Sequence, residues 1–154
     1  MSGHAEQKLN DMGITLPTPP APAANYVPYT IAGNILTISG QITMGSDGLE
    51  YVGKLGETME VEEGAKAAQL CAVNVLAQAK AALGDLDRIK QVVKIQGFVN
   101  STPDFTDHAL VVNGASNFLG EVLGEAGKHA RAAVGMSSLP FGVAVEVDAV
   151  IEFS

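Results

Sequence analysis

The stretch ARAAVGMSSLPFGVAVEVDAVIEF, residues 130–153, carries the clearest fold signal in this chain. From Val143 to Phe153 every second residue is apolar, and three acids lie at positions between them: Glu146, Asp148 and Glu152. Because successive side chains of a β-strand point to opposite faces, this alternation predicts a strand with one buried face and one acidic face. Residues 130–136 form a second apolar run, and the loop SSLPFG between the two runs predicts a hairpin.

Arg131 is the one basic residue in this stretch and the first candidate for a binding role. If the two runs pair across the loop, Arg131 lies opposite or diagonal to Asp148 and Glu146, on the same face. Ala133 and Gly135 continue that face with almost no side chain, so we expect a small concavity where a guanidinium could bind a carboxylate bidentately. The same pattern also fits a cross-strand ion pair without function, which the residue pattern alone favours.

Two upstream segments have the three- and four-residue apolar periodicity of amphipathic helices. The first covers residues 60–83 and is expected to end at the glycine that follows. The second is expected to be capped by Thr102, with Pro103 at its first position, and to end at Gly124 or Gly127.

Further strands are predicted in residues 27–43, around a Gly33–Asn34 turn, and in residues 89–99. The element order is therefore β-β-α-β-α-β-β, which predicts an α+β fold with both helices on one face of a mixed sheet. The other sheet face would have no cover from this chain, and its apolar character leads us to expect oligomerisation through it. The apolar residues expected there are Ala133, Gly135, Ala144 and Val150.

The chain is expected to form a single domain over residues 1–154. Residues 1–24 are predicted to form a short helix, capped by Ser2 and ending at Gly13, and then an extended arm. The arm is predicted from the four prolines of PTPPAPAAN, residues 17–25, which favour a polyproline-type conformation. The compact core is expected to comprise residues 25–154.

The charge balance argues against a nucleic-acid partner. Nine lysines and arginines are outnumbered by 17 acids, for a formal net charge of −8, and the basic residues form no cluster. Neutralising phosphates supplies much of the affinity of nucleic-acid-binding proteins, which therefore usually carry a basic footprint. The sequence has neither a signal-peptide pattern nor the apolar run of about 20 residues that a membrane span needs, so we expect a cytoplasmic protein without membrane association.

Neither a metal site nor a cofactor is predicted. The histidines, His4, His108 and His129, lack metal-ligand spacing, and each is expected to be structural or solvated. The sequence contains no P-loop, dinucleotide fingerprint or G-x-S-x-G elbow. The single cysteine, Cys71, lies in a helical pattern and is expected to be a small buried core residue.

Five segments, in order, resemble the reactive intermediate deaminase (RidA/YjgF) family. They are YVPYTIAGNILTISGQI (26–42), VVKIQGFVN followed by DF (92–105), Asn113, ARAAV (130–134) and LP followed by VEVDAVIEF (139–153). The resemblance spans roughly residues 25–153 and implies a chorismate-mutase-like fold, assembled as a homotrimer with a cleft at each subunit interface. It also implies a cofactor-free hydrolase that converts 2-imino acids, such as 2-iminobutanoate and 2-iminopropanoate, and their enamine tautomers to 2-keto acids and ammonia.

The resemblance implies roles for particular residues. The family's carboxylate-binding arginine falls on Arg131 and its water-positioning acid falls on Glu146. The residues expected to bind or surround the substrate are Tyr29, Ser39, Asn113, Ala132 and Ala133, the last two through backbone carbonyls.

Three departures from the family pattern indicate a divergent branch. Ala133 stands where the family often has a cysteine, the second helix is longer between Phe105 and Asn113, and the N-terminal extension is additional. Two alternatives to the deaminase stay open. One is a non-catalytic trimer that binds a small carboxylate-bearing metabolite as a sensor or regulator. The other, ranked last, is an endoribonuclease or translation inhibitor.

Overall fold

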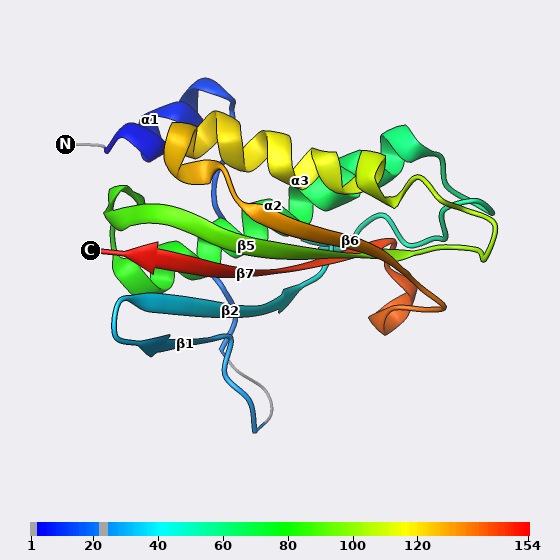
Figure 1. Ribbon diagram of the computed structural model, residues 1–154, viewed down its shortest axis with the longest axis horizontal. Coiled ribbons are helices and arrows are strands. Elements are labelled where there is room, and N and C mark those ends of the chain that lie inside the picture. Colours follow the sequence, from blue (N-terminus) through cyan, green and yellow to red (C-terminus); the bar gives the residue numbers. More distant parts are fainter. Residues whose placement is uncertain (1–2, 22–24) are drawn as a thin grey trace.

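Figure 1 shows the computed structural model, which describes residues 3–21 and 25–154. Its main feature is a five-stranded sheet with the strand order β1-β2-β7-β5-β6. The strands are β1 (Tyr29–Ala32), β2 (Ile35–Gln41), β5 (Ile89–Asn100), β6 (Ala130–Met136) and β7 (Val145–Phe153). A separate hairpin is formed by β3 (Met44–Gly45) and β4 (Gly48–Leu49).

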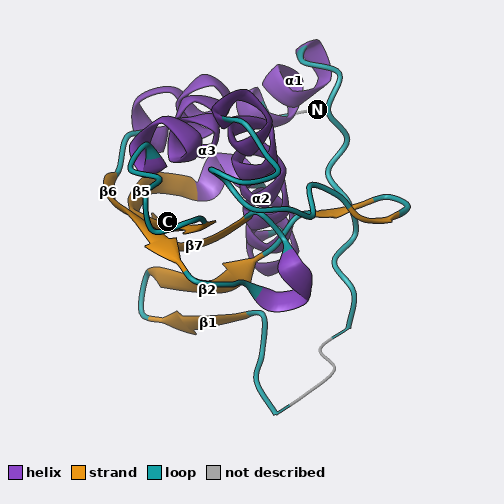
Figure 2. Cartoon of the chain, turned by 90° about the vertical axis from the view of Figure 1, so that its right-hand side faces the viewer, coloured by secondary structure: helices purple, strands orange, loops and turns teal. Residues whose placement is uncertain are grey.

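Two long helices cover one face of this sheet, as Figure 2 shows. The helices are α1 (His4–Asp11), α2 (Val61–Leu83) and α3 (His108–Leu123), with short 3-10 turns η1 (Leu86–Arg88), η2 (Gly124–Gly127) and η3 (Pro140–Gly142). The predicted α+β fold, the β-β-α-β-α-β-β order of its main elements and the placement of both amphipathic helices on one face are therefore confirmed.

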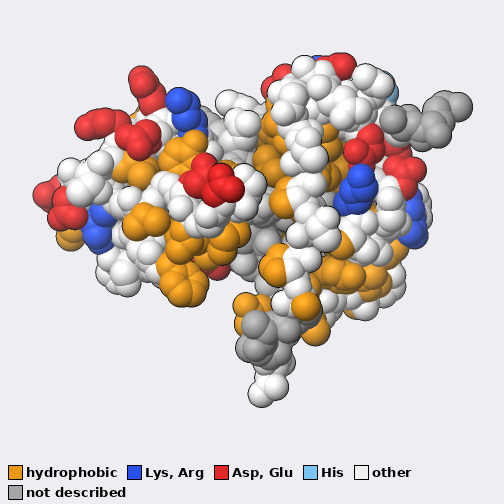
Figure 3. Space-filling model, turned by 180° about the vertical axis from the view of Figure 1, so that it is seen from behind, with side chains coloured by type: hydrophobic (Ala, Val, Ile, Leu, Met, Phe, Trp, Pro, Cys, Tyr) orange, Lys and Arg blue, Asp and Glu red, His pale blue; other side chains and the backbone are white. Residues whose placement is uncertain are grey.

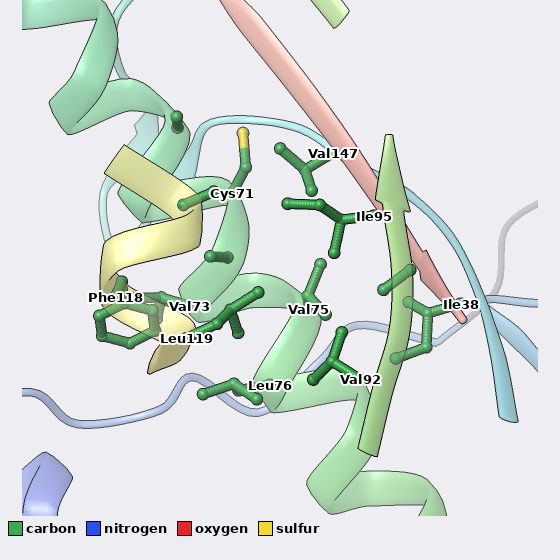
Figure 4. Packing of buried hydrophobic residues seen from close by; sticks show 14 of the residues in the cluster. Ile38, Cys71, Val73, Val75, Leu76, Val92, Ile95, Phe118, Leu119 and Val147 are labelled. Atoms are coloured by element: carbon green, nitrogen blue, oxygen red, sulfur yellow. The ribbon is translucent and has the colours of Figure 1, made fainter. Parts of the chain in front are cut away.

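The core lies between the two long helices and the inner face of the sheet. Val145, Val147, Ala149 and Ile151 of β7 are at most 1% exposed, which confirms the alternation read from the sequence. Figure 4 shows residues of α2 packed against the sheet strands, and the buried thiol of Cys71 donates a hydrogen bond to a β7 backbone carbonyl at 3.3 Å. Each fully buried aliphatic side chain contributes roughly 1.5–3 kcal/mol, so this layer dominates the stability of the fold.

The predicted hairpin in residues 130–153 is wrong, because β6 and β7 are not neighbours. β5 lies between them, parallel to β6 and antiparallel to β7. A strand that follows a helical crossover runs parallel to the strand before the helix, so β5–α3–β6 places β6 at the sheet edge beside β5. The loop that contains η3 then carries the chain to the other side of β5.

This pairing places Arg131 on the helix-covered face. Ile95 of β5 pairs with Arg131 on one side and with Ala149 on the other, and residues paired in this way point to the same face. Glu146 and Asp148 alternate with Ala149 along β7 and so occupy the opposite face. The expectation that Arg131 shares a face with these two acids is therefore wrong.

The second face of the sheet has no cover from the described residues. Of the four apolar residues expected on it, only Val150 lies there. Ala133 and Gly135 share the helix side with Arg131, and Ala144 is fully buried with its N–H bonded to a loop carbonyl. The face is still partly apolar, because other residues alternate onto it: Phe98, Ala132 and Val134.

The second long helix begins at His108, so the expected cap at Thr102 is wrong. The N–H of Thr102 instead donates to the Leu55 carbonyl, because residues 101–102 continue the extended chain beyond β5 and pair with that loop. The predicted C-terminal ends of both long helices are right. α2 stops at Gly84 and α3 stops at Gly124, both of which have positive φ angles that favour glycine.

The hydrophobic core extends into the N-terminal segment, beyond the expected start of the compact core at residue 25. Ala5 and Leu9 of α1 are 3% and 1% exposed. The carboxylate of Asp87 accepts the N–H groups of His4 and Ala5, at 2.7 and 3.0 Å, and so caps the helix from elsewhere in the chain. These two hydrogen bonds lower the pKa of Asp87. The expected cap, Ser2, lies outside the described residues.

Candidate functional site

The guanidinium of Arg131 is fixed by the helix that lies above its strand. Its Nη1 donates to the Asn113 side-chain oxygen at 2.8 Å and to Ser116 Oγ at 3.1 Å, and its Nη2 lies 3.4 Å from the Ala109 carbonyl oxygen. Asn113 and Ser116 are three residues apart in α3, so both face the same strand. The structure thus brings two of the predicted site residues, Arg131 and Asn113, into direct contact.

None of these partners carries a formal charge. Among the described residues, no carboxylate lies within ion-pair distance of Arg131, so the ion-pair interpretation of the sequence is wrong. A guanidinium has five N–H donors, and no hydrogen bond within the described chain uses the Nε–H of Arg131. The half-buried arginine therefore keeps a net positive charge and at least one unused donor.

Ser116 links the arginine to a histidine. Ser116 Oγ lies 2.8 Å from His129 Nε2, and His129 Nδ1 lies 2.6 Å from the Gly127 carbonyl oxygen. A shallow hollow of about 330 Å³ opens over this group, lined by Ser116, Gly120, Gly127, Lys128, His129 and Arg131. It is the cationic part of the candidate site.

Glu146 lies on the other side of the sheet. A Cβ added to Gly40 would lie 1.9 Å from a carboxylate oxygen of Glu146, so the missing side chain at this position makes room for the acid. The β2–β7 register shifts between Ile38 and Gln41, next to this contact. Burial raises the pKa of Glu146, and repulsion from Asp148 raises it further.

Asp148 is the neighbouring acid on the same face. Burial raises its pKa as well, although the Gln96 backbone N–H and the charge of Lys94 partly offset this effect. Two half-buried carboxyl groups with raised pKa values on one uncovered face make this the acidic part of the candidate site.

The remaining predicted residues divide between the two sides of the sheet. Ser39 lies next to Gly40 on the acidic side, and its hydroxyl donates to the Val27 carbonyl at 2.9 Å. Tyr29 pairs with Ile38 and packs partly against the core, on the helix side.

The alanines of β6 divide in the same way. Ala132 pairs with Gln96 and faces the acidic side, whereas Ala133 lies on the same side as Arg131. One chain therefore holds two separated groups rather than an assembled site.

Sequence reasoning missed Ser116, and it assigned His129 to a structural or solvated role without foreseeing its contact with Ser116. The helical period offered a signal, because Ser116 follows Asn113 by three residues and must share its face. The contact with His129 depends on the path of the chain through η2, which no local pattern specifies.

A larger groove lies on the back of the molecule, away from Arg131. Figure 3 shows a hollow there with hydrophobic side chains on both sides. Residues 14–17 of the N-terminal arm, the β3–β4 hairpin and α2 line a cavity of about 570 Å³. Because neither Arg131 nor Glu146 reaches it, the groove is not part of the candidate site.

Comparison with known proteins identifies the family. The family model described as "YjgF/chorismate mutase-like, putative endoribonuclease" matches residues 6–152. The chain belongs to this family. No helix in the described residues is both long and apolar enough to cross a membrane.

The relatives place this YjgF-family chain in a divergent branch. Protein TCP17 of Trypanosoma cruzi is 50% identical over 99% of this chain and 96% of that protein. The crystal structure of Atu1372 from Agrobacterium tumefaciens, a protein of unknown function, is 53% identical over 97% of this chain and 92% of that one, with a TM-score of 0.92. The YjgF gene product of E. coli is 29% identical over 86% of this chain and 92% of that one, with a TM-score of 0.61.

Proposed function

We propose that this protein hydrolyses small 2-imino acids, and their enamine tautomers, to 2-keto acids and ammonia. The observation that carries this proposal is the unneutralised guanidinium of Arg131, held by Asn113 and Ser116 beside an open hollow. Such a group can bind the carboxylate of a small substrate through two parallel hydrogen bonds.

The active site would be completed by a second copy of the chain. Arg131 and Glu146 lie on opposite faces of one sheet, so a single molecule cannot present both to one substrate. In the homotrimer implied by the family resemblance, the acidic face of one copy would meet the Arg131 edge of the next. Each cleft would then receive Arg131 and Asn113 from one copy, and Glu146 and Ser39 from its neighbour.

The chemistry needs few groups, because a protonated imine is already electrophilic. Arg131 would bind the carboxylate and orient the adjacent C=N carbon toward a water molecule. Glu146 would accept a proton as that water adds and return one to the nitrogen, so that the C–N bond breaks, ammonia leaves and the ketone forms. The raised pKa of Glu146 suits it to exchange protons at pH values closer to neutrality.

The other predicted residues would shape the cleft. The backbone carbonyls of Ala132 and Ala133 could accept hydrogen bonds from the water or the departing amine. Tyr29 and Ser39 would line the walls, and Asn113 would orient the arginine through their 2.8 Å hydrogen bond.

The test is ammonia release from 2-iminobutanoate generated in situ from threonine. The wild-type protein should exceed the protein-free rate, and Arg131→Ala should lower kcat/KM by about 100-fold, equivalent to about 2.7 kcal/mol of lost carboxylate binding. Lys90→Ala is the control, because Lys90 is an exposed cation remote from Arg131. An Arg131→Ala variant as active as wild type would rule out the proposal.

A non-catalytic carboxylate-binding trimer is the second candidate, favoured by the same free guanidinium. It predicts that 2-ketobutanoate binds in calorimetry, that Arg131→Ala abolishes binding, and that neither wild type nor Glu146→Gln turns over the imine. If the protein is instead an imine hydrolase, the wild type should turn over the imine. Glu146→Gln should lose this turnover but still bind 2-ketobutanoate. Cleavage of purified RNA, unaffected by either substitution, would point to the endoribonuclease of the family description.

A further inference from the structure

The contacts of His129 define its tautomer. The Gly127 carbonyl can only accept a hydrogen bond, so Nδ1, at 2.6 Å from it, must carry a proton. In neutral His129 the other nitrogen, Nε2, is then an acceptor. Ser116 Oγ is 2.8 Å from Nε2 and must donate its proton to it. Ser116 thus lies against an imidazole base whose orientation is fixed by a third group.

The Ser116 hydroxyl oxygen also contacts a cationic side chain, the guanidinium of Arg131. Arg131 Nη1 donates to Oγ at 3.1 Å, which favours negative charge on that atom. Lys128 lines the same hollow, and the only described ion pair of its ammonium is the surface contact with Glu125, in which both side chains are largely exposed. Surface pairs of this kind are weak, so Lys128 can turn to an anion in the hollow.

A second serine–histidine contact in the chain provides a comparison. Ser101 Oγ lies 3.2 Å from His108 Nε2, but Ser101 is only 7% exposed, and neither residue lines the hollow beside Arg131. The ring of His108 packs edge-on against Phe105. Ser101–His108 is a packed contact, whereas Ser116–His129 borders solvent.

We propose that Ser116 and His129 form an acyl-transfer centre that accepts small esters bearing an anionic group. A nucleophile at hydrogen-bond distance from a base, with the base oriented by a third group, is the arrangement that activates serine hydroxyls. Arg131 and Lys128 lie where they would bind the anionic group or the negative oxygen that develops on the ester carbonyl. This centre shares Arg131 and the hollow with the proposed imine site, but it carries out a different reaction and does not use Glu146.

The reaction balances with water alone. Ser116 Oγ bonds to the ester carbonyl carbon while its proton passes to His129 Nε2. The tetrahedral intermediate then expels the alcohol oxygen, which takes that proton, and leaves an acyl-serine. Water attacks the acyl carbon, gives its proton to Nε2, and the released Ser116 oxygen recovers it. The sum is ester plus water to acid plus alcohol.

The experiment measures covalent labelling and ester hydrolysis on the full chain. A fluorophosphonate should add to the protein with one equivalent per chain, and peptide mass analysis should place it on Ser116. Hydrolysis of 4-nitrophenyl hemisuccinate should exceed that of the uncharged 4-nitrophenyl acetate. Ser116→Ala should abolish both signals, and His129→Gln should lower them by about 100-fold or more.

Ser101→Ala is the matched control and should leave labelling unchanged, with thermal melting used to verify that each variant is folded. Label on another serine, or hydrolysis that survives Ser116→Ala, would overturn the assignment. Because labelling does not depend on ammonia release, loss of either activity alone identifies which of the two proposals has failed.

Discussion

Arg131 shows how a charge can be kept usable inside a largely apolar strand. Its partners are an amide oxygen, a hydroxyl and a backbone carbonyl, which satisfy several N–H donors without neutralising the cation. A carboxylate partner would hold the side chain equally well but would compete with any incoming acid. The asparagine at position 113 therefore holds the guanidinium without neutralising its charge.

Replacing Asn113 by Asp tests this directly. The new carboxylate would lie at hydrogen-bond distance from Nη1 and form the ion pair that the native chain avoids. Calorimetry with 2-ketobutanoate should show affinity lower by about tenfold or more, or 1.4 kcal/mol. Asn117→Asp, on an exposed position of the same helix, adds the same charge away from the guanidinium and should bind like wild type. Equal affinity for all three proteins would contradict the role of Arg131.

On the acidic face, Asp148 makes stability depend on pH. Its folded-state pKa is raised, so the folded chain binds a proton more tightly than the unfolded chain. The free energy of unfolding therefore falls as pH rises from the ordinary aspartate pKa through the raised one. Asp148→Asn should raise the urea midpoint at pH 7.5 and change it less at pH 4. A variant that is destabilised more at pH 7.5 than at pH 4 would refute this account.

At the scale of elements, local sequence patterns predicted the main helices and strands correctly, but they did not predict which strands are neighbours in the sheet. The apolar periods and the glycines at positions 84 and 124 were enough to predict both helices, the residues at which they stop and the alternating β7, but not the residue at which the second helix begins. The neighbours of β6 could not be read locally, because a short loop favours a hairpin while the crossover from β5 decides the actual partner. The candidate site inherited this error: Arg131 and Glu146 were expected on one face of the sheet, but the register places them on opposite faces.

The crossing of α2 and α3 depends on the absence of a side chain at Gly114. A Cβ there would lie 1.9 Å from the Ala65 carbonyl oxygen, so the backbones must separate to admit it. Gly114→Ala should lower the free energy of unfolding by about 1–3 kcal/mol in urea denaturation. Gly120→Ala, in the same helix with nothing within 4 Å of the added Cβ, should instead stabilise by up to about 1 kcal/mol. Similar effects of the two substitutions would contradict the close helix crossing.

At the scale of the whole molecule, the layered arrangement keeps the cationic group and the acidic group of the candidate site on different sides of the sheet. The cationic group lies at one edge under α3, and the two carboxyl groups lie on the uncovered face. The single chain thus has complementary charges that its own sheet keeps apart, and association of copies is the direct way to bring them together. This is why the oligomeric state is the property on which the proposed hydrolysis depends most.

A charge added to the uncovered face should prevent association between copies of the chain without unfolding each copy. Val134 of β6 is 42% exposed and lies on that face. Val134→Asp would add a further acid to a face that already holds Glu146, Asp148 and Glu152. We expect a smaller species in light scattering, unchanged circular dichroism and loss of ammonia release. Val134→Ala controls for side-chain size and should assemble normally, and an active Val134→Asp monomer would exclude a site shared between copies.

The contact between Asp87 and the first turn of α1 has a consequence for biosynthesis. The hydrogen-bonded residues are 82 and 83 positions apart, so the α1 segment leaves the ribosome long before the carboxylate that receives it. Contacts between such distant residues form slowly, because a long loop must close first. Docking of α1 through these two hydrogen bonds therefore has to wait until Asp87 has been synthesised, and the bonds cannot hold Ala5 and Leu9 in the core before then.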